Sequence, residues 1–103
     1  MLESRLPVVN EGGSLLQVFV EPWANDFWLE PGEELVVIAT NENATPEFER
    51  VDERDGLVSV YVNTPGSLFY VMQGDVELEC GHRRPRERGW LRSILTRLGL
   101  MAP

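Results

Sequence analysis

The sequence contains no lysine, one histidine and one cysteine. All nine positive charges are therefore arginines, a bias typical of GC-rich bacterial coding. A lone cysteine excludes an internal disulfide and gives no sign of an oxidising compartment. No apolar run approaches the roughly 20 residues of a membrane-spanning helix, and the N-terminus lacks the pattern of a secretory signal. We therefore expect a soluble, cytoplasmic protein.

The scarcity of soft ligands bears on metal chemistry. Cys80 and His82 are the one place where two such ligands come close in sequence, and they are the only metal candidates. A zinc site needs at least a third protein ligand, which only carboxylates or methionines supply here. A nucleophilic Cys–His pair at this spacing lacks a third group to orient the histidine. We expect no metal site and no cofactor, with Cys80 in the core and His82 at a strand end.

Catalytic motifs are also missing. The sequence has no glycine-rich phosphate loop, no Gly-x-Ser-x-Gly elbow and no His-Glu-x-x-His pattern. Carboxylates are frequent between Glu30 and Asp55, but acid–base catalysis needs two of them in one cleft with pKa values driven apart. A solvated acidic surface is the simpler interpretation. A small hydrolase or isomerase that uses two carboxylates is the alternative.

The most informative stretch is a turn followed by an apolar strand. Pro31-Gly32 predicts a type II turn, because proline presets the first inner position and glycine supplies the positive φ of the second. Residues 35–39 then read Leu-Val-Val-Ile-Ala, apolar on both faces. Such a strand is typical of the interior of a sheet that is covered above and below.

Short segments with period two continue through residues 14–81, separated by turn signals every eight to twelve residues. Asp55-Gly56 is the strongest of these signals and predicts a type I′ hairpin. Residues 47–52 predict a charged edge strand. The pattern predicts an antiparallel β-sandwich of about seven short strands over residues 14–84, preceded by a flexible segment over residues 1–13.

The last part of the chain differs in period and in charge. Residues 1–81 hold sixteen of the seventeen carboxylates and carry a net charge of −13, whereas residues 82–103 carry +5. We predict a basic amphipathic helix over residues 85–99 and a short tail over residues 100–103. The apolar stripe of this helix consists of Trp90, Leu91, Ile94, Leu95 and Leu98.

Three roles for this helix remain open. In the first role the helix covers a sheet face of its own domain. In the second it docks on a protein partner or on its copy in a dimer, and in the third it lies on an anionic membrane surface. Nucleic acid is disfavoured by the acidic body.

A second candidate surface consists of Trp23, Phe27 and Trp28, because exposed aromatic side chains concentrate binding energy. Packing of these side chains in the core is the alternative. The function hypothesis is a non-enzymatic binding or interaction module.

Two resemblances bear on the fold. The Pro31-Gly32-Glu33 turn resembles turns of cupins and cupredoxins, but their metal sites use more histidines than this chain has. The second is carried by Glu21-Pro22, by residues 27–33 (Phe-Trp-Leu-Glu-Pro-Gly-Glu) and by Cys80-Gly81-His82. With these features the chain resembles a family of small bacterial β-sandwich proteins of unknown function, over roughly residues 15 to 85. This resemblance implies a fold and no activity.

Overall fold

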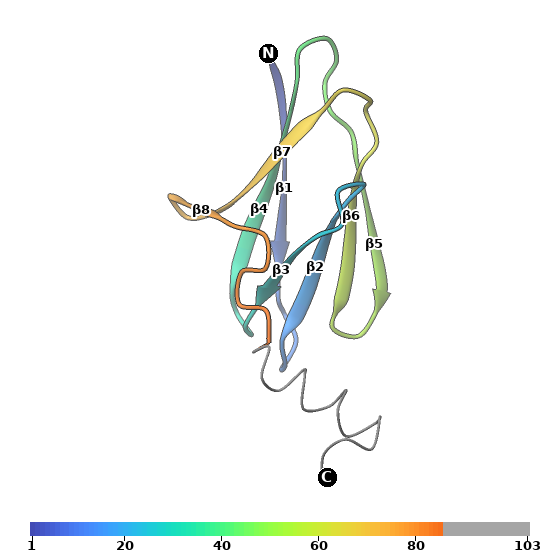
Figure 1. Ribbon diagram of the computed structural model, residues 1–103. Coiled ribbons are helices and arrows are strands. Elements are labelled where there is room, and N and C mark those ends of the chain that lie inside the picture. The colour runs from blue at the N-terminus through green and yellow to red at the C-terminus, as the bar shows by residue number, and fades with distance from the viewer. Residues whose placement is uncertain (86–103) are drawn as a thin grey trace, which may run out of the picture.

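The fold is that of a computed structural model, which describes residues 1–85. Two four-stranded sheets make up this part of the chain (Figure 1). The first sheet has the order β1 (Leu2–Val9), β4 (Glu34–Asn41), β7 (Leu68–Gln73) and β8 (Val76–Leu78). The second has the order β3 (Asn25–Leu29), β2 (Leu16–Glu21), β6 (Leu57–Val62) and β5 (Phe48–Arg54). The mainly β prediction is confirmed. The predicted helix lies, apart from Pro85, outside the described residues.

Strand β4 is the interior strand that the sequence predicted. It pairs with β1 on one side and with β7 on the other, antiparallel in both cases. Leu35, Val37 and Ala39 face the second sheet and are fully buried. On the opposite face Ile38 is only 2% exposed although no strand within residues 1–85 covers it, and it lies in register between Arg5 and Tyr70. Val36, on the same face, stays half-buried, so the outer cover is partial.

One hydrophobic core lies between the two sheets. Strands β2 and β6 contribute a valine ladder, and β3 contributes Phe27 and Leu29. Burying a side chain of this size stabilises a fold by about 1.5–3 kcal/mol, so this β-branched core holds the layers together. The valines of the ladder are Val18, Val20, Val58, Val60 and Val62.

Two features of the topology differ from the prediction. Residues 1–13 were expected to be flexible, but Leu2–Val9 forms β1 at the edge of the first sheet. Buried Asn10 then ends this strand, because its side-chain amide donates to the carbonyls of Ser14 and Leu29 at 2.8 and 2.9 Å. The second sheet is not purely antiparallel, since β2 and β6 run parallel. Sequence period alone does not distinguish the two directions.

The turns behave largely as predicted. Gly32 has φ +84° and Glu33 N–H donates to the carbonyl of Glu30 at 3.0 Å, as a type II turn requires. Asp55-Gly56 does connect β5 to β6, and β5 is an edge strand. However, Gly56 has φ +80° while Asp55 does not have a positive φ, so the predicted type I′ turn is wrong. A register shift between Asp52 and Arg54 accommodates the difference.

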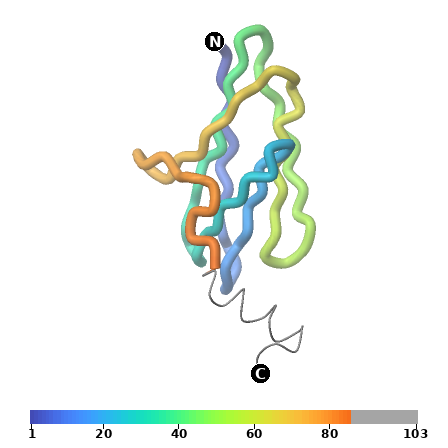
Figure 2. The backbone as a smooth tube through the Cα atoms, viewed as in Figure 1, coloured from blue at the N-terminus to red at the C-terminus, as the bar shows by residue number. Residues whose placement is uncertain are grey.

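After β8 the chain leaves the first sheet and runs beside β3 of the second, the orange segment in Figure 2. His82 forms an isolated parallel bridge with Phe27. The amide of Gly81 donates to the carbonyl of Asp26 at 2.6 Å, and the amide of Trp28 donates to the carbonyl of His82 at 2.9 Å. These bonds cover the edge of β3, which would otherwise present unpaired backbone groups.

None of the elements within residues 1–85 is a helix of the length and hydrophobicity needed to cross a membrane.

Candidate ligand-binding hollow

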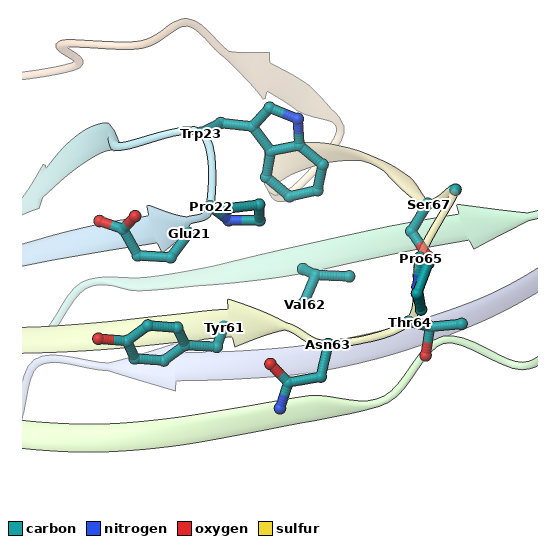
Figure 3. Close-up of a pocket in the computed structure, with 10 residues that line it drawn as sticks. Glu21, Pro22, Trp23, Tyr61, Val62, Asn63, Thr64, Pro65 and Ser67 are labelled. Atoms are coloured by element: carbon teal, nitrogen blue, oxygen red, sulfur yellow. The ribbon is translucent and has the colours of Figure 1, made fainter.

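A surface hollow of about 450 Å³ lies where the turn between β2 and β3 meets the loop between β6 and β7 (Figure 3). We call it the end hollow. Its wall includes two large aromatic side chains, Trp23 and Tyr61, and two prolines. Ligand sites favour concave surfaces with apolar walls and a few polar groups. The lining residues are Glu21, Pro22, Trp23, Tyr61, Val62, Asn63, Thr64, Pro65, Gly66 and Ser67.

Trp23 is held rigidly in this wall. Its ring packs against Phe69 of β7 with centroids 4.4 Å apart and an interplanar angle of 32°. Both rings are partly buried against the core. The turn that carries Trp23 begins with a cis bond between Glu21 and Pro22 and continues through Ala24, which has φ 56°. The indole is therefore part of the scaffold on one side and lines the hollow on the other.

The opposite wall is organised by a buried asparagine. Asn41, only 4% exposed, donates from its side-chain amide to the carbonyl of Pro65 at 2.9 Å and to the hydroxyl of Ser67 at 3.1 Å. Its side-chain oxygen accepts from the amides of Asn43 and Ala44 at 2.8 and 3.0 Å. One side chain thus fixes the loops that follow β4 and β6. A loop that is fixed before binding loses less entropy when a ligand arrives.

The charge at the end hollow is negative. Glu21 is the one charged side chain among the lining residues within the described part of the chain. It lies in register with Tyr61 across the parallel pair of β2 and β6. Thr64 uses its hydroxyl oxygen to accept from the amide of Glu47 at 2.9 Å. The hollow therefore combines apolar rings with a carboxylate, an amide and hydroxyl groups.

A second polar cluster centres on Asp26 of β3, which is 7% exposed. The carboxylate accepts from the indole N–H of Trp28 at 2.9 Å and from Arg84 Nε at 2.8 Å. A terminal nitrogen of Arg84 and the thiol of Cys80, with its sulfur 3.6 Å away, donate to the other oxygen. Next to Arg84, Arg83 pairs with Glu33 at 3.2 Å.

These contacts determine the protonation of Asp26. Hydrogen bonding from Arg84 lowers the pKa of its carboxyl from 3.8 to about 2, against the opposing effect of burial. The contact with Asp26 in turn raises the pKa of Arg84. A general acid needs a carboxyl pKa near the working pH. Asp26 is shifted in the opposite direction, so this cluster is a structural clamp for residues 80–84 and not an acid–base pair.

Cys80 and His82 are not paired with each other among the described residues, and the thiol of Cys80 donates to Asp26 instead. Cys80 is exposed, contrary to the expected core position. The Nε2 atom of His82 is buried and has no hydrogen-bond partner among the described residues. Both residues border a shallower hollow of about 370 Å³ beside β8. Within residues 1–85, no group of three or more His, Cys, Asp or Glu side chains is placed to hold a metal ion.

The three aromatic residues of the second candidate surface do not come together. Trp23 lines the end hollow. Phe27 is buried in the core with 2% exposure, so no ligand reaches it. Trp28 is half-buried on the outer face of the second sheet, where Asp26 holds its indole. The apolar stripe of the predicted helix lies outside the described residues: Trp90, Leu91, Ile94, Leu95 and Leu98.

Sequence reasoning missed Tyr61 and Asn41. Tyr61 belongs to a strand whose alternation points it away from the core, and nothing local indicates that the chain near Trp23 packs beside it. Asn41 did carry a signal, because an asparagine that ends an apolar strand before a polar loop often caps that loop with its side chain.

Comparison of the chain with protein-family models, with curated proteins and with solved structures gives no match.

Proposed function

We propose that this protein is a non-enzymatic binding module whose ligand occupies the end hollow. The observation that carries the proposal is the placement of Trp23, backed by Phe69, opposite a loop that Asn41 fixes. Rigid aromatic side chains supply contact area at low cost in conformational entropy. Loops at one end of a β scaffold are also where binding residues concentrate.

Binding is better supported than catalysis by the same geometry. Glu21 is the one carboxylate that lines the end hollow among residues 1–85. The hydrolase or isomerase alternative requires two carboxylates in one cleft. The strongly perturbed carboxyl, Asp26, has a lowered pKa and is occupied by Arg84 and Trp28. A hollow with one carboxylate and rigid rings supports recognition of a ligand.

Fluorine NMR of protein labelled with 5-fluorotryptophan tests this proposal. Trp23, Trp28 and Trp90 give three resonances, which single Trp→Phe variants assign. In a screen of short peptides and sugars, ligands should shift the Trp23 resonance and leave that of Trp28 in place. Trp28 is the internal control, because Asp26 holds it outside the end hollow. Ligands that shift Trp28 but not Trp23 would show that the site lies elsewhere.

A second candidate function uses the basic C-terminal segment. Arg84 clamps on Asp26, and Arg83 pairs with Glu30 and Glu33 at 3.5 and 3.2 Å, which fixes where the chain leaves the body. We propose that the segment beyond this clamp docks on its own body or on a partner. Size-exclusion chromatography and thermal melting of the full chain and of a chain ending at Pro85 distinguish these roles. If the segment docks on its own body, the chain ending at Pro85 should be a monomer that is less stable than the full chain. If it docks on a partner, the two chains should be equally stable.

A further inference from the structure

We infer that the ligand of the end hollow is a proline-rich peptide in the polyproline II conformation with a basic residue beside its prolines. This inference rests on the proposed function, because it names the ligand class of the same site. Three properties of the hollow carry it: the shape of its apolar wall, the donors that its side chains offer, and its charge.

The apolar wall consists of flat, rigid rings. Trp23 lies in the turn between β2 and β3 and Tyr61 lies in β6, and Pro22 and Pro65 lie in the two loops that border the hollow. Figure 3 shows the indole of Trp23 above Val62, with Tyr61 next to Val62 on the same strand, β6. Aromatic-lined grooves of this composition accept the ridges of polyproline II helices, which are already ordered before they bind.

A polyproline II segment has no internal hydrogen bonds, so its carbonyls need donors from the protein. The wall offers five side chains with N–H or O–H groups for this purpose: the indole of Trp23, the phenol of Tyr61, the amide of Asn63 and the hydroxyls of Thr64 and Ser67. In Figure 3 the indole nitrogen lies on the side of its ring away from Val62.

The charge selects among peptides. Glu21 is the single charged lining residue of residues 1–85, and residues 1–81 as a whole carry −13. An arginine or lysine beside the prolines would pair with Glu21, whereas an acidic or phosphorylated ligand would be repelled. The same field would speed the encounter with a basic peptide at low ionic strength.

The test is a titration of the full chain with the peptide Ac-Pro-Pro-Arg-Pro-Pro-Leu-Pro-NH2. Backbone amide NMR monitors the binding. A control peptide replaces every proline by alanine. Glu21→Gln removes the charge at the hollow, and Glu77→Gln on β8 is the matched control. We expect Glu21→Gln to weaken binding by about 1.5-fold to fivefold, the range for one partly exposed charge pair, and Glu77→Gln to leave it unchanged. The alanine peptide should bind at least tenfold more weakly.

The outcomes separate this inference from the proposed function. Proline-dependent shifts at residues 61–67 that Glu21→Gln weakens support both. If the proline peptide does not bind but a sugar shifts the same amides, the ligand class is wrong and the end hollow remains the site. If the peptide binds and Glu21→Gln weakens it no more than Glu77→Gln, the basic residue is not recognised and the inference fails. If no probe shifts these amides, both proposals fail.

Discussion

Arg84 donates from Nε and from a terminal nitrogen to the carboxylate of Asp26, which lies 58 positions earlier in the chain. This contact attaches the segment after β8 to the edge of β3. We predict that Asp26→Asn lowers the free energy of unfolding by about 1–2 kcal/mol, because it removes the charge from hydrogen bonds in a mostly buried site. Urea unfolding followed by far-UV circular dichroism measures the change.

Asp52→Asn is the matched control for that variant. Asp52 pairs with Arg50 at 3.1 Å, but its side chain is 70% exposed. Exposed pairs contribute little, so we expect a change within about 0.5 kcal/mol. Equal losses in the two variants would mean that the Asp26 clamp is no more than an ordinary surface ion pair.

The same clamp predicts a dependence of stability on pH. The folded chain lowers the pKa of Asp26 from 3.8 to about 2 because Arg84 binds the ionised form. The stabilisation is therefore fully present above about pH 4 and is lost as the pH falls toward about 2. The melting temperature of Asp26→Asn should approach that of the parent chain across this interval. A gap between the two proteins that stays constant from pH 5 to pH 2 would contradict the assigned cause.

Asn41 is predicted to hold the wall of the end hollow. Asn41→Ala removes two donated and two accepted hydrogen bonds in a buried position, so we expect a loss of about 1–3 kcal/mol. Asn41→Asp keeps the acceptors for Asn43 and Ala44 but loses the donors to Pro65 and Ser67. Amide hydrogen exchange in residues 63–67 should then become faster in both variants. In residues 42–44 it should become faster only in Asn41→Ala.

Ala24 has a φ of 56°, a region that costs a non-glycine residue about 1–2 kcal/mol. Ala24→Gly should therefore stabilise the protein by about 0.5–1 kcal/mol once the greater entropy of glycine in the unfolded chain is subtracted. Ala44→Gly is the control, because Ala44 does not have a positive φ, and it should not stabilise. Thermal melting measures the change in stability of both variants. A destabilised Ala24→Gly would show that the turn beside Trp23 is not strained.

The sequence predicted those parts of the fold that depend on local pattern. The Pro31-Gly32 turn and the interior strand after it follow from backbone sterics and from apolar residues on both faces. The strand at Leu2–Val9 was missed because its buried positions alternate only weakly, with Val8 the one fully buried side chain. The parallel pairing of β2 with β6 is a long-range choice that no local pattern encodes.

The candidate site was predictable only in part, for the same reason. Trp23 stood out as an aromatic residue beside a loop, but its neighbours in the end hollow are some 40 positions away. Phe27 and Trp28 were equally prominent in sequence. Because side chains alternate along β3, Phe27 lies in the core and Trp28 lies on the outer face. The Asp26 clamp joins residues whose proximity depends on the path of the chain after β8.

The most direct test of this account is a map of all backbone amide shifts of the full chain on saturation with the proline-rich peptide. If the peptide binds in the end hollow, the largest shifts fall in residues 21–24 and 61–67, on the two sides of this hollow. Largest shifts on the outer face of the first sheet, around Ile38 and Tyr70, or no shift at any peptide concentration, would contradict this account.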